Sequence, residues 1–372
     1  MDHIYLDYNA STPVAPEVIE AMTPLLRDFY GNSSALHWAG APVKGFMQKA
    51  REQVAGLLGC VPEEIIFTSG GSEANNLALK GFFFKNKSRG NHIITSKIEH
   101  PAVMNPCKFL ESIGAKVTYV GVNQYGRVSP EEIEKAITKE TILISIMHSN
   151  NETGTLQPIQ EIGNIAERHG IAFHTDASQS VGKVPVNVNE LKVDMLTIAG
   201  HKLYAPKGSG ALYKRKGIEL EPLIHGAGHE SGLRAGTENT LLAVGLGKAC
   251  EIAENHVGNR ALKELTDYFW ERLKQQFGDL VQLNGHPEER LPNTLNVSFV
   301  KRIGQDLLSE IPQLAASTGS ACHAGSIELS PVLKDMAIPE EVGMGAIRFS
   351  LGSQTTKDEI DQVLLWLKEA IN

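Results

Sequence analysis

The sequence predicts an α/β fold with a large, mainly parallel sheet covered by helices on both faces, together with a small α+β domain. Short β-rich runs alternate with helical stretches up to about residue 213, an alternation typical of parallel sheets. From about residue 237 the pattern changes to two long helices followed by shorter strands and helices, which indicates a separate layer.

A chain of 372 residues has room for two domains. We expect a large domain over residues 15–255 and a small domain formed by residues 1–14 and 256–372. The opening segment, which reads as extended chain rather than as a helix, is expected to join the small domain.

The predicted elements follow from hydrophobic periodicity and from the residues at their boundaries. A first helix begins at Pro16, and a longer second helix ends near Leu58, where Gly59 is suited to a C-cap. The β-rich runs are residues 64–68, 92–95, 116–120, 142–147, 171–175, 195–198 and 210–213. The later helical stretches are residues 72–84, 101–112, 130–138, 158–169, 237–255, 259–277 and 357–371.

The bulk composition excludes several classes of protein. Hydrophobic residues make up 42% of the chain and charged residues 21%, as in ordinary globular proteins. The net charge of −8 argues against a general nucleic-acid or anionic-membrane surface. The chain has no run of about 18 apolar residues and no secretory signal at its start, so we expect a cytoplasmic protein without a membrane partner.

The cysteines predict neither a disulfide framework nor a metal site, because none of their spacings is metal-like. Cys60, Cys107 and Cys250 have aliphatic or helical neighbours and are expected to pack as small apolar side chains. Cys322 differs because it lies in a run of small residues, 317–326, where an exposed thiol is a better nucleophile. An incidental loop cysteine is the alternative.

One strand end carries an unusual lysine. The run 195–198 breaks at Ala199-Gly200 and is followed by His201-Lys202. A lysine at this place suits an amine that forms a Schiff base, its pKa lowered by desolvation, although a surface lysine at a turn is the simpler alternative. The run 171–175 ends at a carboxylate, Asp176. A lysine and an acid for a pyridinium nitrogen are the two protein groups that pyridoxal phosphate chemistry requires.

Other polar residues also follow predicted strands. The paired glycines before Ser72 favour an anion at a helix start, although Ser72 also suits a simple N-cap. His100 suits a ring stacked on a flat cofactor, or else a capping residue. Asn150 and Asn151 suit a turn or a hydrogen bond to a ligand. Arg348, inside an apolar run, needs an anion, either a structural carboxylate or that of a substrate.

In this order the motifs resemble the cysteine desulfurases of the class V aminotransferase group, which have the fold type I architecture of enzymes dependent on pyridoxal phosphate. The motifs run nearly end to end: Tyr5-Leu6-Asp7-Tyr8, Ser69-Gly70-Gly71-Ser72-Glu73-Ala74-Asn75-Asn76, Glu99-His100-Pro101, Asn150-Asn151-Glu152-Thr153-Gly154, Asp176-Ala177-Ser178-Gln179-Ser180, His201-Lys202, Arg234-Ala235-Gly236-Thr237-Glu238-Asn239, Gly319-Ser320-Ala321-Cys322 and Ile347-Arg348-Phe349-Ser350.

The resemblance implies roles for the residues that contact the cofactor ring. Lys202 would hold pyridoxal 5'-phosphate as an internal aldimine and, once displaced, move the α-proton of the substrate. Asp176 would pair with the pyridinium nitrogen, Gln179 would bond the phenolic oxygen, and His100 would stack on the ring.

The resemblance also implies how the remaining groups are bound. Gly71, Ser72 and His201 would contact the phosphate. Thr237 would reach the phosphate from a second subunit, which implies a homodimer with shared active sites. Asn151 is assigned to both cofactor and substrate binding. With Arg348, it would hold the substrate carboxylate.

The implied function is that of an L-cysteine desulfurase. Cys322 would attack the substrate sulfur, leaving a persulfide on the enzyme and releasing L-alanine. The sulfur would then pass to a protein acceptor in iron–sulfur cluster or thio-modification pathways. The alternatives are a selenocysteine lyase and a non-catalytic partner in a sulfur-transfer complex. A kynureninase-like enzyme or a transaminase fits less well, because neither needs a nucleophilic cysteine.

Two positions depart from the family's pattern. Ala199 stands where many members have a serine that bonds the phosphate, so one phosphate ligand is missing or replaced. His323 follows Cys322 where a small hydroxyl residue is common, which alters the surroundings of the thiol.

Overall fold

A computed structural model describes residues 3–258, 260–318, 322–323 and 326–371, without the side chains of residues 322, 323, 326 and 327. Its largest sheet has seven strands in these ranges, in the order β2-β8-β7-β6-β5-β3-β4. They are β2 (Ile65–Thr68), β3 (His92–Ser96), β4 (Lys116–Val120), β5 (Thr141–Ser145), β6 (Ala172–Asp176), β7 (Met195–Ala199) and β8 (Gly210–Lys214). Adjacent strands are parallel except at β8, which is antiparallel to both of its neighbours. Every β-rich run predicted up to residue 213 is therefore confirmed as a strand.

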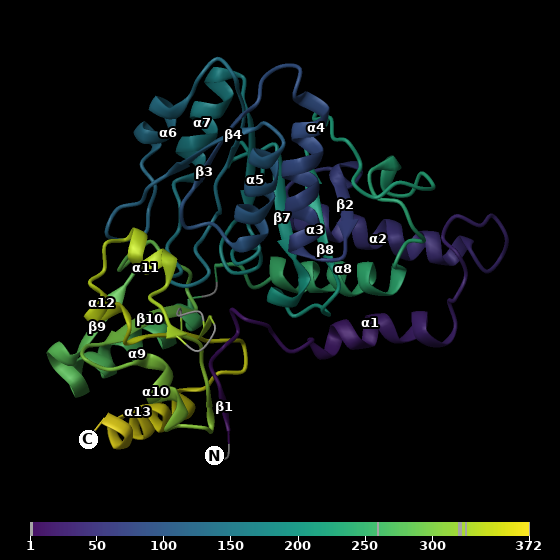
Figure 1. The fold of residues 1–372 in the computed structure, drawn as a ribbon. Helices are drawn as coiled ribbons and strands as arrows, with labels where there is room; N and C mark the ends of the chain where they lie inside the picture. Colours follow the sequence, from purple (N-terminus) through teal and green to yellow (C-terminus); the bar gives the residue numbers. More distant parts are fainter. Residues whose placement is uncertain (1–2, 259, 319–321, 324–325, 372) are drawn as a thin grey trace.

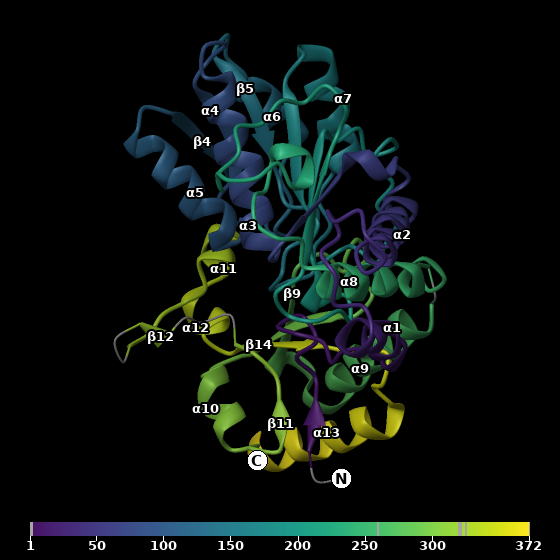
Figure 2. The same ribbon diagram turned by 90° about the vertical axis from the view of Figure 1, so that its right-hand side faces the viewer.

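Helices cover both faces of this sheet, as the sequence predicted (Figures 1 and 2). Successive strand residues point to opposite faces, so Ile93 packs in one hydrophobic cluster and Ile94 in another. The cluster around Ile94 includes α1 (Pro16–Arg27), α2 (Ala41–Leu58), α6 (Pro130–Ala136), α7 (Ile159–His169) and α8 (Thr240–Glu254). The cluster around Ile93 includes α3 (Gly71–Asn76), α4 (Phe82–Asn86) and α5 (Pro101–Ser112).

The helix predicted over residues 72–84 has an irregular centre. Between α3 and α4 the chain makes a π-helical turn, Leu77–Gly81. The Gly81 carbonyl accepts a hydrogen bond from Glu221 N at 2.9 Å, and a Cβ on Gly81 would lie 2.7 Å from the Glu221 carbonyl oxygen. A segment distant in sequence thus approaches the helix where it widens.

A second hydrophobic core lies below the large sheet (Figure 1). Its three-stranded antiparallel sheet has the order β14-β10-β9, and Phe269 packs edge-on against Phe349 at 5.1 Å between ring centroids. Ile4 and Leu6 from the N-terminal segment belong to this core. The strands here are β1 (Ile4–Tyr5), β9 (Val281–Asn284), β10 (Thr294–Phe299), β11 (Leu314–Ala315), β12 (Cys322–His323), β13 (Ser326–Ile327) and β14 (Ala346–Ser350). The helices of this core are α9 (Ala261–Phe277), α10 (Gly304–Ser309) and α13 (Lys357–Ile371). Of the other two helices in this part of the chain, α11 (Pro331–Asp335) and α12 (Glu340–Gly343), α11 packs in a small separate cluster with Ile98 and Met147.

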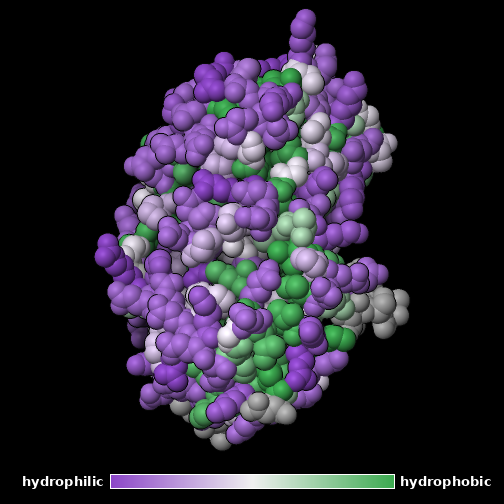
Figure 3. Space-filling view, turned by 90° about the vertical axis from the view of Figure 1, so that its left-hand side faces the viewer, coloured by the Kyte–Doolittle hydropathy of each residue, from purple (hydrophilic) through white to green (hydrophobic). Residues whose placement is uncertain are grey.

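Short 3-10 turns complete the described chain: Pro62–Glu64, Gly200–Lys202, Glu230–Gly232 and Gly278–Leu280. One face of the molecule is mainly hydrophilic, with a hydrophobic band over its lower half (Figure 3). Among the described helices, none is both long enough and apolar enough to span a membrane.

Candidate active site

A cavity of about 350 Å³ lies at the carboxyl ends of the parallel strands, where α/β sheets commonly bind ligands. It is bounded by the ends of β6 and β7, the start of α3, the residue before α5, and β14 of the second core. The cavity brings together most of the side chains singled out from the sequence: Gly71, Ser72, His100, Asn151, Asp176, Gln179, His201, Lys202 and Arg348.

Lys202 ends the short turn that follows β7, so the strand carries its amine to the sheet edge. Lys202 Nζ donates hydrogen bonds to the carbonyl oxygens of Asn9 and Ala10, the second at 2.9 Å. Burial lowers the pKa of Lys202 to about 8, with a further contribution from Arg348. A sizeable fraction of this amine is therefore neutral near physiological pH, as a nucleophilic lysine requires.

Asp176 is the last residue of β6 and is only 7% exposed. Its Oδ2 accepts a hydrogen bond from Asn75 Nδ2 at 2.7 Å, and its Oδ1 accepts one from Ser178 N at 3.0 Å. Both carboxylate oxygens are thus fixed by N–H donors. Asn75 belongs to a motif noted in the sequence, but its side-chain role was not predicted.

His100 caps α5 and faces the same cavity. Its Nδ1 accepts a hydrogen bond from Ala102 N at 3.1 Å, which assigns the ring proton of the neutral form to Nε2. Partial burial lowers the pKa of His100; Asp176 opposes this shift and Lys202 adds to it. The capping role proposed as an alternative is therefore present, and it leaves Nε2 free to act in the cavity.

The end of the cavity near α3 suits an anion. The first N–H groups of a helix have no intrahelical acceptor, and Gly71 and Ser72 present this helix start to the cavity. Gly70 adopts a φ of 147°, a conformation that favours glycine. Burial lowers the pKa of His201 to about 4, so its imidazole is neutral and retains one N–H donor.

Arg348 reaches the cavity from β14 and already has a carboxylate partner. Its Nη2 donates to Asp7 Oδ1 at 2.7 Å, and its Nη1 donates to the Asn151 carbonyl oxygen at 2.8 Å. Its Nε is buried and has no partner among the described residues. The structural carboxylate considered from sequence is therefore Asp7, and Arg348 retains N–H capacity for a ligand. Asn150 is a turn residue, because its Oδ1 accepts the N–H group of Glu152 at 2.9 Å.

Comparisons with known proteins agree with this arrangement. Residues 4–363 match the family model described as Aminotransferase class-V. The chain is 48% identical to cysteine desulfurase IscS of Dictyoglomus turgidum, covering 99% of this chain and 94% of that protein. It is 46% identical to cysteine desulfurase IscS of Methanosarcina thermophila, with 99% and 92% covered.

The chain belongs to the cysteine desulfurases.

Solved structures extend the likeness to the whole fold of this desulfurase. A NifS-like protein superposes with a TM-score of 0.93 at 37% identity, covering 99% of each chain. A structure of SspA in complex with cysteine gives a TM-score of 0.83 at 43% identity, with 93% and 98% covered. The fold is accordingly that of the fold type I enzymes predicted from sequence.

The desulfurase depends on pyridoxal 5'-phosphate, and the residues of its cavity fit that group. A Cβ on Gly71 would lie 3.0 Å from Ser178 Oγ and 3.2 Å from Ala199 Cβ, so glycine keeps space open beside the helix start. This helix start suits the phosphate, Asp176 suits the ring nitrogen, and Lys202 suits the aldehyde carbon.

Of the predicted site residues of the desulfurase, Thr237 does not line the cavity, and Cys322 cannot be placed relative to it. Thr237 is exposed on the segment between Glu230–Gly232 and α8. The backbone of Cys322 lies in β12, paired with Ile327 of β13, but the Cys322 side chain is outside the described residues. His323, noted from the sequence as a neighbour of the thiol, likewise has no described side chain.

Besides the side-chain role of Asn75, sequence interpretation missed the contacts that Asn9 and Lys183 make with the predicted site of the desulfurase. Asn9 is fully buried, and its carbonyl oxygen accepts from both Lys202 Nζ and Gln179 Nε2. Lys183 Nζ donates to Gln179 Oε1 at 3.0 Å. The spacing of four residues between Gln179 and Lys183 was visible in the sequence, whereas nothing there linked Asn9 to either lysine.

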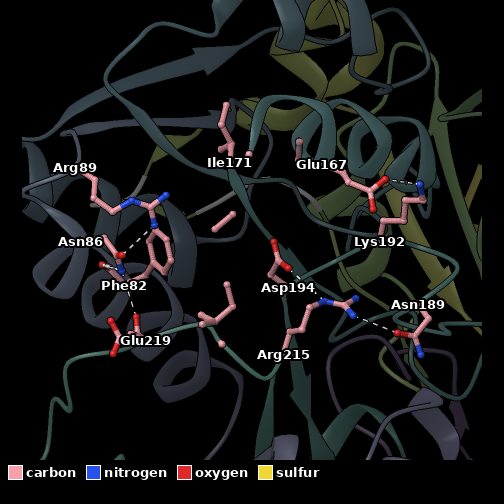
Figure 4. A pocket seen from close by; sticks show the side chains of 15 residues that line it. Phe82, Asn86, Arg89, Glu167, Ile171, Asn189, Lys192, Asp194, Arg215 and Glu219 are labelled. Atoms are coloured by element: carbon pink, nitrogen blue, oxygen red, sulfur yellow. Dashed lines mark hydrogen bonds and ion pairs between the residues drawn. The ribbon is translucent and has the colours of Figure 1, made fainter.

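Another cavity, of about 470 Å³, lies at the amino ends of the parallel strands β6 and β7, away from the carboxyl ends that carry the predicted site (Figure 4). Its charged walls largely pair with one another: Lys192 Nζ lies 2.5 Å from Glu167 Oε2, and Arg215 Nε lies 3.3 Å from Asp194 Oδ1. We therefore assign the chemistry of the desulfurase to the cavity that contains Lys202.

Proposed function

We propose that this enzyme converts L-cysteine to L-alanine and stores the removed sulfur as a persulfide on Cys322. The Cys322 thiolate forms a bond to the substrate sulfur, and the substrate carbon–sulfur bond breaks. Its electron pair goes to Cβ, which takes a proton. The balanced reaction is therefore L-cysteine plus enzyme thiol giving L-alanine plus enzyme persulfide. The observation that supports it is one cavity containing Lys202, Asp176, His100 and Arg348 in a cysteine desulfurase.

The residues of the cavity bind the substrate and move its protons. Arg348, with Asn151, holds the substrate carboxylate through the Nη hydrogens that its bonds to Asp7 and to the Asn151 carbonyl oxygen leave available. Lys202 Nζ takes the α-proton, because its lowered pKa keeps part of it neutral. His100 Nε2, which faces the same cavity, can pass protons. Bound pyridoxal 5'-phosphate supplies an electron sink for these steps, and Asp176 would pair with its ring nitrogen.

We propose that the enzyme acts as a homodimer in which Thr237 contributes to the partner's phosphate site. Thr237 is exposed and therefore free to contact a partner. Its neighbour Glu238 accepts a hydrogen bond at 2.5 Å from Ser33, whose loop carries the strongly exposed Leu36 and Trp38. Large apolar side chains exposed beside a proposed active-site residue suit a subunit interface.

Three further assignments belong to this proposal. The large domain comprises residues 15–255, and the small domain comprises residues 1–14 and 256–372; their separate hydrophobic cores support this division. Persulfide sulfur passes from Cys322 to a protein acceptor in iron–sulfur cluster or thio-modification pathways. The reaction takes place in the cytoplasm.

The decisive experiment measures alanine released from L-cysteine, with reductant present, by the wild type and by Cys322→Ala. We expect the variant to lose release while its cofactor absorbance stays normal. Equal release by both proteins would remove Cys322 from the mechanism and favour a lyase. If Cys322→Ala releases no alanine from L-cysteine but still releases it from selenocysteine, the thiol is needed to remove sulfur but not selenium. Absence of cofactor absorbance after pyridoxal 5'-phosphate is added would favour the non-catalytic partner.

A further inference from the structure

A second lysine, Lys183, lies beside the catalytic cavity and has no part in the mechanism above. Lys183 lines a neighbouring cavity of about 550 Å³, which Lys202 also lines. Lys183 Nζ donates to Gln179 Oε1 at 3.0 Å and to Asn9 Oδ1 at 3.2 Å. A lysine amine held by two side-chain amides, rather than by a carboxylate, is not the usual pairing of a structural charge.

The contact with Lys183 determines which way the Gln179 amide faces. A primary amide has a donor end and an acceptor end, whereas an ammonium group only donates. The carbonyl end of Gln179 must therefore face Lys183, and its Nε2 then donates to the Asn9 carbonyl oxygen at 2.9 Å. With the amide reversed, two donors would face each other. Asn9 is the acceptor that the described residues offer to Nε2, so one N–H remains for the cavity that Gln179 lines.

Asn9, the second partner of Lys183, also contacts the catalytic lysine. Its carbonyl oxygen accepts from Lys202 Nζ, and its side chain is held at both ends. Asn9 Oδ1 accepts from Lys183 and from Asn293 Nδ2 at 3.1 Å, while Asn9 Nδ2 donates to Thr294 Oγ1 at 2.8 Å. Lys183 thus contacts the side chains of Gln179 and Asn9, and the Asn9 carbonyl oxygen accepts from both Gln179 Nε2 and Lys202 Nζ.

We propose that Lys183 is a positioning residue of the desulfurase that orients the Gln179 amide, so that an N–H group faces the phenolic oxygen of pyridoxal 5'-phosphate. This inference rests on the proposed function and on the bond to the phenolic oxygen that the family resemblance implies for Gln179, and it adds a residue that the family motifs do not include. Lys183 does not touch the reacting atoms itself. It acts through Gln179 and, by holding Asn9, on the acceptor of the Lys202 amine.

The arrangement does not require Lys183 to be charged. Burial lowers the pKa of Lys183 to about 7, with Lys202 and Arg348 contributing. The ammonium form has three hydrogens and the neutral amine has two, which are enough for the bonds to Gln179 Oε1 and Asn9 Oδ1. The neutral amine can also accept a hydrogen bond, but a reversed amide would still turn Gln179 Oε1 towards the Asn9 carbonyl oxygen, so that two acceptors would face each other. The orientation of the amide should therefore persist on both sides of this pKa.

The test uses the absorbance of the bound cofactor rather than turnover. Holoenzyme is titrated with alkali, and the midpoint of the absorbance change is compared for wild type, Lys183→Met, Gln179→Leu and the double variant. An N–H donor stabilises negative charge on the phenolic oxygen, so its loss raises the midpoint. We expect a rise of about one pH unit in each single variant, the scale of one lost hydrogen bond to an ionised group.

The double variant distinguishes orientation of the Gln179 amide by Lys183 from a general effect of removing the lysine, because only the first makes the two shifts in midpoint non-additive. If Lys183 acts through Gln179, the double variant matches Gln179→Leu alone. Full addition of the two shifts, or a wild-type midpoint in Lys183→Met, would overturn the proposal. Lys192→Met, which removes a lysine paired with Glu167 far from the cavity, serves as the matched control and should keep the wild-type midpoint.

Two further measurements keep the outcome interpretable. Lys183→Arg retains donors and should keep a midpoint near that of the wild type; if it shifts as far as Lys183→Met, orientation by donated hydrogen bonds is wrong. Cofactor release should be faster in Lys183→Met than in Lys192→Met by about threefold to tenfold. Failure of Cys322→Ala to abolish alanine release would refute the proposed persulfide step without altering these absorbance results, so the two proposals fail separately.

Discussion

Arg348, which lines the catalytic cavity, forms an ion pair with Asp7 that joins segments near the two ends of the chain. The bond from Arg348 Nη2 to Asp7 Oδ1 measures 2.7 Å, and the two side chains are 10% and 17% exposed. The guanidinium that we assign to the substrate carboxylate is therefore already paired with a carboxylate of the protein. The negative charge of Asp7 therefore weakens the attraction of Arg348 for anions. The same charge raises the pKa of Lys202, against the lowering caused by burial.

Asp7→Asn should strengthen substrate binding, because the amide keeps an acceptor for Arg348 Nη2 but removes the competing charge. We expect the KM for L-cysteine to fall about threefold to tenfold, the scale of a charge pair in a partly solvated site. Steady-state kinetics at fixed pH and ionic strength measure this change. Asp335→Asn is the control, because its partner Lys97 lies 4.0 Å away outside the cavity. An unchanged or higher KM in Asp7→Asn would mean that Asp7 mainly orients Arg348.

Ala199→Ser should slow the loss of the cofactor. Ala199 lies beside Gly71 at the end of the cavity that suits an anion, at the position where the family resemblance implies a phosphate-binding serine. An added hydroxyl gives one more donor, and we expect cofactor release to slow about threefold to tenfold. Ser178→Ala removes the neighbouring hydroxyl and should accelerate release. Holoenzyme is mixed with an excess of another apoprotein that binds any pyridoxal 5'-phosphate released, and the loss of cofactor absorbance from the holoenzyme is followed over time. Equal release rates for wild type and Ala199→Ser would show that the phosphate needs no further donor.

The sequence predicted the large sheet because each of its strands is a short apolar run, and because helices separate most of these runs. The strand ends then identified Lys202, Asp176 and His100, since parallel strands deliver the residues at their carboxyl ends to one edge. The π-helical turn at Leu77–Gly81 was missed because it coincides with a contact from Glu221, far away in the sequence.

The residues around Asn9 were also missed for a physical reason. Asn9 bonds Gln179 and Lys202, which are 170 and 193 residues away, so its role depends on the path of the N-terminal segment across the cavity. For Arg348, the residue type indicated an anion, but only the fold decides which carboxylate lies beside it. That partner is Asp7.

Glu99→Gln should make stability less dependent on pH. Glu99 is 6% exposed; its Oε1 accepts from Ser96 Oγ at 2.7 Å and from Met147 N at 2.9 Å, and its Oε2 has no partner among the described residues. Burial raises the pKa of Glu99 from 4.5 to about 8. Between these values the folded state keeps a proton that the unfolded state releases, so the free energy of unfolding falls as pH rises.

The glutamine has no proton to release, so its variant lacks this loss. We expect the difference in free energy of unfolding between pH 5 and pH 8.5 to be smaller in Glu99→Gln than in the wild type by on the order of 3 kcal/mol. Denaturant unfolding of the holoenzyme at the two pH values measures it. Glu134→Gln, on an exposed helix, is the control. Parallel pH dependence in wild type and Glu99→Gln would show that Glu99 ionises normally.

The pair Arg51–Glu230 should contribute far more to stability than a surface ion pair. Two hydrogen bonds, of 2.9 and 2.8 Å, join the guanidinium to the carboxylate, and Glu230 Oε2 also accepts from Phe67 N at 2.9 Å. The Glu230 side chain is only 4% exposed. This carboxylate ties the segment that leads to Thr237 onto β2.

Glu230→Gln keeps the shape of the side chain but removes its charge and one acceptor, leaving buried donors on Arg51 without a partner. We expect the free energy of unfolding to fall by about 3 kcal/mol, because breaking one side of a buried pair leaves an uncompensated charge. Glu251→Gln breaks the more exposed pair with Lys248 and should cost less than about 1 kcal/mol. Denaturant unfolding of both variants tests the contrast. Similar losses of stability in the two variants would mean that water reaches Glu230 and screens its charge. The segment before Thr237 would then be held by its other contacts, such as the bond of 3.0 Å from Arg234 Nε to Glu73 Oε1.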